Sequence, residues 1–185
     1  MKSMYPSSRK SSLQLNEVYF WTATVKDWKK LLSQDKYKRL IINTWKEFTL
    51  KGLIKVYGFV IMPNHLHVIW ELLLLNGKEK PHASFTKKTA HEIVKDLKAH
   101  HPKVLPYFEV TDKERAHRIW QRDSLGVLMD SKEKLEQKLD YIHANPLQER
   151  WNLVTRTEDY PWSSASFYEL GDSAFDFITD YRERF

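Results

Sequence analysis

The sequence contains no cysteine among its 185 residues. This absence excludes structural disulfides, thiolate catalysis and zinc sites built on cysteine. No apolar run approaches the length of a membrane-spanning helix, and residues Met1–Ser12 lack the apolar stretch of a signal peptide. We therefore expect a cytoplasmic protein with no membrane partner.

The composition is that of a folded chain, with 42% hydrophobic and 14% aromatic residues. The 30 Lys and Arg residues exceed the 24 Asp and Glu residues and give a net charge of +6, a mild excess that suits a polyanionic partner. The aromatic residues either fill the core or offer flat surfaces on which unpaired bases stack.

The order of predicted elements indicates the fold. Apolar and β-branched residues predict strands at 17–25, 53–62 and 65–73, and helical spacing predicts helices at 35–50 and 84–100. Residues 101–117 are predicted as a loop, and residues 118–129 as strand material interrupted at 123–126. A last helix begins after Asp130 or Ser131 and ends before Pro146. This order predicts an α+β, ferredoxin-like βαββαβ sandwich with an additional C-terminal helix.

We expect a single domain over residues 17–170, preceded by a flexible N-terminus at 1–16 and followed by a C-terminal tail at 171–185. The sequence shows no internal repeat. From Trp151 onward the chain is aromatic and irregular, and we expect Tyr160, Trp162, Phe167 and Tyr168 to pack back onto the body.

Two histidines flank Leu66 in the third predicted strand. Alternate residues of a strand point to the same face, so His65 and His67 are expected side by side. Leu66, Val68, Trp70 and Leu72 form the core-facing row, which leaves the histidines on the face that need not be buried. Two neutral imidazoles on one strand make a partial site for a divalent metal, although a structural or surface pair is the alternative.

The last predicted helix carries a tyrosine away from its apolar stripe. Leu135, Leu139 and Ile142 form that stripe, whereas Lys134, Lys138, Tyr141 and Asn145 share a second one. A tyrosine phenol can attack a phosphodiester and conserve its bond energy in a phosphotyrosine intermediate. Asn145, one turn beyond Tyr141, is either an oxygen ligand of the metal or a cap of the helix end.

Three separated motifs carry a family resemblance. Residues Met62–His67 (MPNHLH), Tyr141–Pro146 (YIHANP) and Pro161–Ser164 (PWSS) are similar, in order and spacing, to the REP-associated branch of the HUH single-tyrosine, IS200-like transposases. The resemblance extends from about Val18 to Tyr168. A Trp-Gln-Arg run ending at Arg122 also resembles the family's, and the residues after it match less closely.

The resemblance implies an HUH fold, a metal site at His65 and His67 completed by Asn145, and Tyr141 as the nucleophile. It implies Mg²⁺ or Mn²⁺ as the cofactor and single-stranded or hairpin DNA at palindromic repeats as the partner. The implied activity is that of a DNA transposase, a single-strand endonuclease and strand transferase that forms a 5′-phosphotyrosine. From the sequence, a monomer and a homodimer both stay open.

Basic residues supply the candidate DNA contacts. The second predicted helix places Lys87, Lys88, Lys95 and Lys98 largely off its apolar stripe, where they either line a nucleic-acid groove or form a solvated face. Lys134, Lys138 and Arg122 complete the set. Two rival functions stay open: a non-catalytic single-stranded nucleic-acid-binding module of ferredoxin-like fold, and an HUH nickase of the replication or mobilisation type.

Overall fold

The computed structural model describes residues 13–112, 115–122, 124–171 and 174–185. The elements in chain order are β1 (Glu17–Thr24), α1 (Asp35–Leu50), β2 (Ile54–Ile61), β3 (His65–Leu72), α2 (Pro81–His100), β4 (Glu109–Asp112), β5 (Arg115–His117), β6 (Leu125–Leu128), α3 (Lys132–Ala144) and α4 (Ala165–Leu170).

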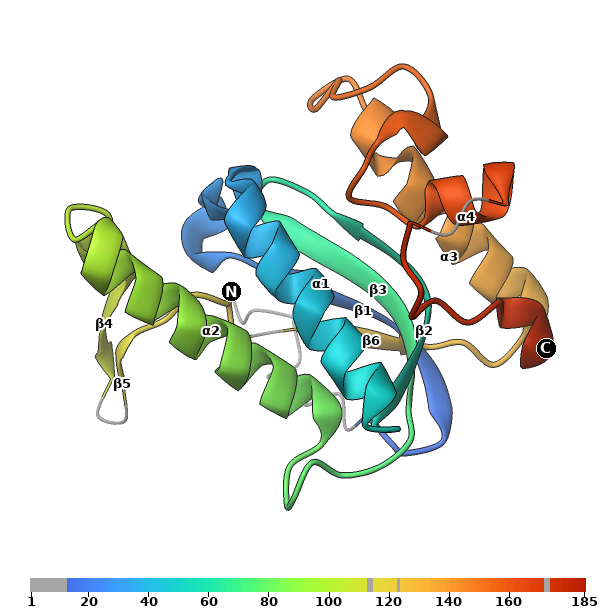
Figure 1. Ribbon diagram of the computed structural model, residues 1–185, viewed down its shortest axis with the longest axis horizontal. Coiled ribbons are helices and arrows are strands. Elements are labelled where there is room, and N and C mark those ends of the chain that lie inside the picture. The colour runs from blue at the N-terminus through green and yellow to red at the C-terminus, as the bar shows by residue number, and fades with distance from the viewer. Residues whose placement is uncertain (1–12, 113–114, 123, 172–173) are drawn as a thin grey trace, which may run out of the picture.

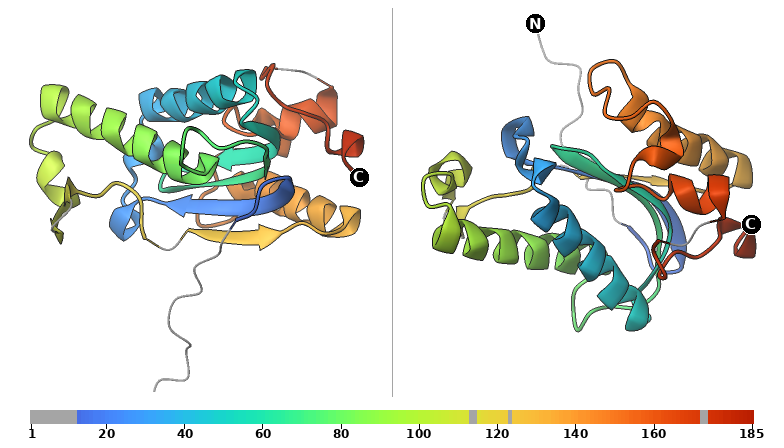
Figure 2. Two further views of the ribbon diagram at one scale, coloured as in Figure 1. Left: turned by 90° about the horizontal axis from the view of Figure 1, so that it is seen from below. Right: turned by 45° about the horizontal axis from the view of Figure 1, so that its top comes forward.

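Four strands form the central sheet, in the order β2-β3-β1-β6 with every neighbouring pair antiparallel. Helices α1 and α2 lie on one face of this sheet, and α3 lies on the other (Figures 1 and 2). This is the order of a ferredoxin-like sandwich with β6 as its last strand, so the predicted α+β class is confirmed.

The sheet separates two hydrophobic cores. Toward α1 and α2, residues such as Trp21 and Trp70 are buried against Trp45 and Phe85. Toward α3, the apolar stripe Leu135, Leu139 and Ile142 is buried against strand residues that include Val18, Phe20 and Ile69. Burial of the same strands by helices on both sides explains why every residue of β3 is buried.

Helix α3 approaches the sheet closely at one glycine. A Cβ atom at Gly58 would overlap Cδ1 of Leu139 and would lie 3.3 Å from Oγ of Ser164. The missing side chain therefore lets α3 lie directly on β2.

Ser131 caps the start of α3, where its Oγ accepts a hydrogen bond from the backbone nitrogen of Lys134 at 3.3 Å.

Two segments differ from the sequence-based prediction. Residues 101–117 contain the β4–β5 hairpin in addition to loop, and the strand predicted over 118–129 is shortened to β6. Trp120 instead forms an isolated bridge with Val25, and its indole nitrogen donates to Oγ1 of Thr89 at 3.0 Å. The side chain of Trp120 thereby joins this segment to α2.

Both ends of the described chain pack on the body. The predicted flexible N-terminus lies outside the described residues up to position 12, whereas Leu13 is buried. In the C-terminal tail Phe177 is buried, and the backbone nitrogen of Thr179 donates to the carbonyl of Val56 at 2.8 Å. As predicted, Tyr160 is buried, and Trp162 and Tyr168 pack on the cores.

Among the described residues, no helix is long and apolar enough to cross a membrane.

Candidate functional site

The two histidines of β3 lie side by side beneath α3. The ring centroids of His65 and His67 are 4.8 Å apart, and the ring planes meet at 73°. The predicted pairing on one strand face is therefore confirmed. The prediction that this face need not be buried is wrong, because His65 is 3% exposed and His67 is 6% exposed. The alternation along β3 predicted which side chains share a face, but the cover of this face comes from α3 and from loop residues distant in the sequence.

Each histidine is held through the same ring nitrogen. Nδ1 of His65 lies 2.7 Å from Oδ1 of Asn64, and Nδ1 of His67 lies 2.7 Å from Oγ1 of Thr22. An amide oxygen only accepts, so Nδ1 of His65 donates and its Nε2 keeps a free lone pair. Within the described part of the chain, neither Nε2 atom has a hydrogen-bond partner. An outer partner on one nitrogen with the other nitrogen available is the arrangement of metal-binding histidines.

Burial keeps both imidazoles neutral. Desolvation lowers the pKa of His65 to about 4, with a smaller contribution from the positive charge of Arg150. Desolvation also lowers the pKa of His67 to about 3, with further contributions from His65, Lys138 and Arg150. At neutral pH both rings are therefore in the unprotonated form that binds metal ions.

Tyr141 lies on α3 above this pair and is 42% exposed, as its position off the apolar stripe predicted. Its ring centroid lies 5.6 Å from that of His67 and 6.2 Å from that of Phe20. Nζ of Lys138 lies 5.5 Å from the centroid of the Tyr141 ring, so a positive charge accompanies the phenol. The tyrosine is thus held between the buried histidines and solvent.

Asn145 is fully buried at the end of α3, and its two amide atoms differ in their surroundings. Nδ2 donates to the backbone carbonyl of Tyr141 at 2.9 Å, which caps the helix end. Oδ1 is buried without a hydrogen-bond partner in the described structure. Leaving such an atom unsatisfied costs about 1–3 kcal/mol. The side chain of Asn145 therefore caps the helix end and also keeps one oxygen atom without a partner.

The donor set is compatible with a divalent ion. Among the described residues, no group of three His, Cys, Asp or Glu side chains is arranged to hold a metal. The candidate donors are the two Nε2 atoms of the histidine pair, together with the unpartnered Oδ1 of Asn145. Amide oxygens suit Mg²⁺ and Mn²⁺, and imidazole nitrogens suit softer divalent ions, so this mixed set fits Mn²⁺ at least as well as Mg²⁺.

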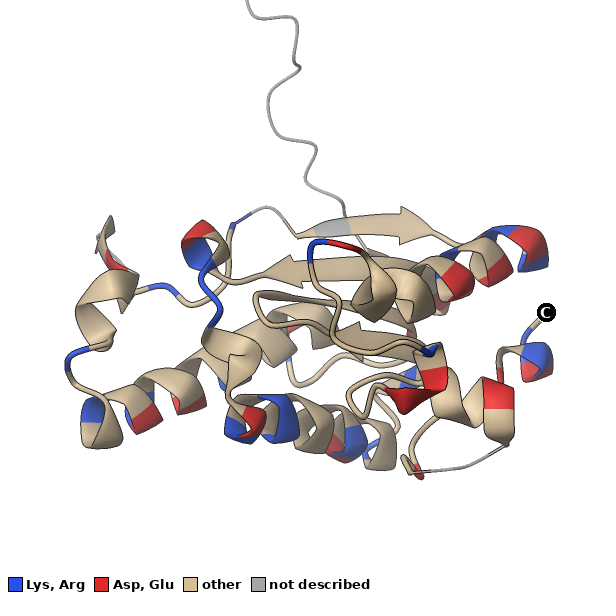
Figure 3. Ribbon diagram, turned by 90° about the horizontal axis from the view of Figure 1, so that it is seen from above, with Lys and Arg blue, Asp and Glu red and all other residues tan. Residues whose placement is uncertain are grey.

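The candidate DNA-binding lysines divide between the two sides of the sheet. Lys134 and Lys138 lie on α3, with Lys134 paired to Asp130 at 2.9 Å. Helix α2 lies on the other side, where Lys87 pairs with Glu79, Lys88 pairs with Glu47, and Lys95 and Lys98 are exposed. Acidic residues are interspersed with the basic ones along both helices (Figure 3). The structure therefore does not bring the α2 lysines to the histidine pair.

Arg122 directly follows a residue that is hydrogen-bonded to the end of β1 beside the histidine pair. The backbone nitrogen of Gln121, the preceding residue, donates to the carbonyl of Thr24 at 2.8 Å. Thr24 is in turn the β1 partner of His65. Arg122 is exposed.

Several residues around His65 were not predicted from the sequence. Trp28 is 58% exposed, and its ring centroid lies 6.2 Å from that of His65. Trp151 lies 6.0 Å from His65 by the same measure, and the cations of Lys30 and Arg150 lie over its ring. These residues come from two loops far apart in the sequence, so no local pattern connects them to the histidines.

The sheet order, with α1 and α2 on one face and the added helix α3 on the other, defines an α+β sandwich of the ferredoxin-like kind. The chain is similar in fold to a solved structure of a REP-associated tyrosine transposase bound to a REP hairpin, with a TM-score of 0.60 and 17% sequence identity. The similarity covers 94% of this chain and 91% of that chain. No family model and no curated protein sequence matches the chain. The relationship is therefore one of fold.

Proposed function

We propose that the chain is a metal-assisted DNA strand transferase of the transposase type, with Tyr141 as its nucleophile and residues 17–170 as its catalytic domain. The observation that carries the proposal is the position of Tyr141. Its exposed phenol ring lies against the ring of His67, and its backbone carbonyl is bound by Asn145, whose Oδ1 is unpartnered. The nucleophile therefore lies beside one histidine of β3, and its own helix end carries Asn145 one turn further along.

In this proposal His65, His67 and Asn145 hold the divalent ion. Bound there, Mg²⁺ or Mn²⁺ would polarise the scissile phosphate and neutralise charge that develops on it. Asn64 and Thr22 fix the orientation of the two imidazoles through their Nδ1 atoms. All three proposed protein donors are neutral, so the charge of the divalent ion would remain available to an anionic phosphate.

Tyr141 carries the covalent step. Its phenolic oxygen forms a bond to phosphorus while the bond from phosphorus to the 3′ oxygen breaks, so that the strand is joined to the protein through a 5′ phosphate. The phenolic proton passes to solvent, and the departing 3′ oxygen takes up a proton to become a hydroxyl. Lys138, whose charge lies over the tyrosine ring, favours a phosphate placed beside the phenol. Attack by a 3′ hydroxyl on the phosphotyrosine reverses the step and rejoins DNA.

The proposed substrate is single-stranded or hairpin DNA. Support comes from the fold neighbour, which is bound to a REP hairpin. The exposed aromatic rings of Trp28 and Tyr107 and the cations beside Trp151 provide surfaces for unpaired bases and for backbone phosphates in this chain. Monomeric and homodimeric forms are both compatible with the proposed chemistry, because the nucleophile and the metal donors lie in one chain.

A panel of labelled single-stranded oligonucleotides drawn from sequence flanking the gene tests the function. With Mg²⁺ or Mn²⁺, we expect a shortened strand with a 3′ hydroxyl and a protein–DNA adduct that survives denaturing detergent. EDTA should abolish both products. Tight binding without cleavage of any strand, hairpins included, would instead identify a non-catalytic binding module. Cleavage without rejoining to a second strand would favour the nickase.

A further inference from the structure

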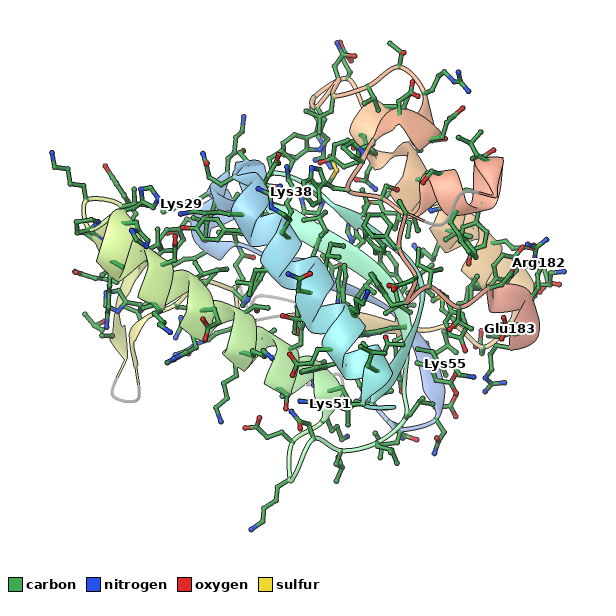
Figure 4. The ribbon with its side chains drawn as sticks, viewed as in Figure 1. Lys29, Lys38, Lys51, Lys55, Arg182 and Glu183 are labelled. Atoms are coloured by element: carbon green, nitrogen blue, oxygen red, sulfur yellow. The ribbon has the colours of Figure 1, made fainter. Side chains whose placement is uncertain are left out.

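A pocket of about 350 Å³ opens at the end of the molecule where the α2 helix ends. It lies among the loop after β1, the first turn of α1 and the short helix at Leu105–Phe108. Its volume is in the lower part of the range of roughly 300–1,000 Å³ that is typical of small-ligand pockets. The lining residues are Lys29, Lys30, Leu31, Gln34, Tyr37, Leu97, His101, Val104, Tyr107 and Phe108. Lys29 is visible at this end in Figure 4.

The lining combines flat rings with positive charge. Tyr107 is 62% exposed, and Nζ of Lys29 lies 5.3 Å from the centroid of its ring. Leu97 and Phe108 are buried and give the pocket an apolar wall. The side-chain amide of Gln34, which can both donate and accept, makes no hydrogen bond within the described structure. An aromatic ring, an apolar wall, an amide and an ammonium group are the features that bind a nucleotide.

Nearby carboxylates do not cancel this charge. Asp96 accepts hydrogen bonds from Nζ of Lys36 at 2.5 Å and from the hydroxyl of Tyr37 at 2.7 Å. Asp27 is paired with Lys26 at 2.7 Å. Asp96 and Asp27 are therefore each paired with another lysine, which leaves Lys29 and Lys30 to attract an anion.

The pocket is linked to the histidine pair through Trp28. The backbone carbonyl of Trp28 accepts a hydrogen bond from Nδ2 of Asn64 at 3.2 Å, and Oδ1 of the same asparagine binds His65. Lys29 and Lys30 follow directly in the chain, and Lys30 lies over Trp151, which packs beside His65. Asp27 and Trp28 have positive φ angles of 54° and 55°, which residues other than glycine rarely adopt.

We propose that this pocket binds one unpaired nucleotide of the DNA strand, at a position flanking the one cleaved at Tyr141. The base stacks on Tyr107 beside Gln34, and the phosphate lies between Lys29 and Lys30. Between the histidines and the pocket, the strand contacts the rings of Trp28 and Trp151. This inference rests on the proposed function for its substrate, but it assigns a separate binding site with its own residues.

Binding without cleavage tests the pocket independently of the chemistry. A fluorescein-labelled single-stranded oligothymidylate is titrated with the full chain in EDTA, and its affinity is read by anisotropy. Tyr107→Leu removes the stacking ring but keeps an apolar side chain, and we expect it to weaken binding about tenfold. Lys29→Ala should weaken binding several-fold. Lys55→Ala removes the same charge at the opposite end of the molecule and serves as the matched control (Figure 4).

Cross-linking locates the base. Irradiation of the complex with a 5-iodouracil-substituted strand should attach DNA to the peptide that contains Tyr107. Affinities of the Tyr107 and Lys29 variants equal to that of Lys55→Ala, or cross-links confined to other peptides, would overturn the proposal. Displacement of the strand from the pocket by micromolar thymidine monophosphate would also overturn it, in favour of a free-nucleotide site.

The pocket and the proposed function fail in different ways. Loss of binding in the pocket variants, together with no covalent adduct from any oligonucleotide, would leave the nucleotide site standing and remove the strand transferase. A normal covalent adduct, together with unchanged DNA binding in the pocket variants, would leave the strand transferase standing and remove the nucleotide site. Thermal melting of each variant confirms that a loss of affinity does not come from unfolding.

Discussion

At the scale of single residues, the histidine pair and Asn145 each keep one side-chain atom without a hydrogen-bond partner in the described structure. Both imidazoles use Nδ1 in hydrogen bonds, and Asn145 uses Nδ2, while its Oδ1 is buried and unpartnered. An unsatisfied buried polar group is unfavourable, and the proposed metal ion would give these atoms a partner.

The first prediction concerns metal binding. Calorimetric titration of Mn²⁺ into the double variant His65→Gln/His67→Gln should show no binding, because a glutamine keeps a polar side chain but offers no imidazole nitrogen. Asn145→Ala should weaken binding about tenfold or more. Asn145→Asp should restore it, since a carboxylate oxygen is a stronger ligand for Mn²⁺ than an amide oxygen. Mn²⁺ binding that is undiminished in the histidine variant would show that the ion lies elsewhere.

At the scale of elements, the site depends on how closely α3 lies on the sheet. Gly58→Ala places a methyl group into the space of the Leu139 side chain. We expect this overpacking to lower the free energy of unfolding by about 1–3 kcal/mol and to displace Tyr141 from His67. Urea denaturation measures the first effect, and the rate of adduct formation measures the second.

A compensating change provides the control for this prediction. The second substitution Leu139→Ala removes the clashing atoms, so Gly58→Ala/Leu139→Ala should recover adduct formation relative to Gly58→Ala. Full activity and stability in Gly58→Ala alone would mean that α3 tolerates displacement from β2.

Much of this arrangement could be predicted from periodicity. The stripe of Leu135, Leu139 and Ile142 predicted the buried side of α3, and the exposure of Tyr141 followed from its angle to that stripe. The alternation along β3 paired the histidines. It could not show that they are buried, because their cover comes from a helix more than 60 residues later in the chain.

Other parts of the site depend on tertiary contacts that leave no local pattern. Trp28 and Trp151 meet His65 from separate loops, and the contact of Asn64 with the carbonyl of Trp28 involves a backbone atom. The β4–β5 hairpin has strands of four and three residues, which are too short to produce a readable alternation.

At the scale of the whole molecule, the two groups of candidate DNA-binding lysines lie on opposite sides of the sheet. Neutralising Lys134 and Lys138 should reduce the slope of log affinity against log salt by roughly 0.7 for each phosphate that these lysines neutralise. Neutralising Lys87, Lys88, Lys95 and Lys98 should reduce it less, because α2 lies on the face of the sheet opposite to α3 and Tyr141. Anisotropy titrations across a salt series compare the two sets. A larger effect from the α2 set would place the DNA across that face.

Histidine burial makes stability depend on pH. Desolvation lowers the pKa of His65, His82 and His143 to about 4 and that of His67 to about 3, from an ordinary value of 6.5. Between pH 6.5 and 4 the unfolded chain therefore binds more protons than the folded one, and the free energy of unfolding falls as the pH falls. We expect a loss of at least about 2 kcal/mol between roughly pH 6.5 and 5.

Urea denaturation in EDTA measures this loss above the range in which most carboxylates titrate. His143 is hydrogen-bonded to Oγ of Ser164 at 2.8 Å, and His143→Gln keeps a hydrogen-bond partner for that atom. This substitution should make the pH dependence of the free energy of unfolding shallower. A denaturation midpoint that does not change over this pH range would contradict the burial of neutral histidines.

The most direct measurement of the central claim is the covalent adduct of Tyr141. Tyr141→Phe removes one oxygen from a ring that is 42% exposed, so folding and DNA binding should persist. With a cleavable single strand and Mg²⁺ or Mn²⁺, the unaltered protein should form an adduct that resists denaturing detergent, and peptide mapping should place the DNA on Tyr141. The Phe variant should bind the same strand and form no adduct. Adduct formation by Tyr141→Phe at the unaltered rate would contradict the account, because another residue would then attack the phosphate.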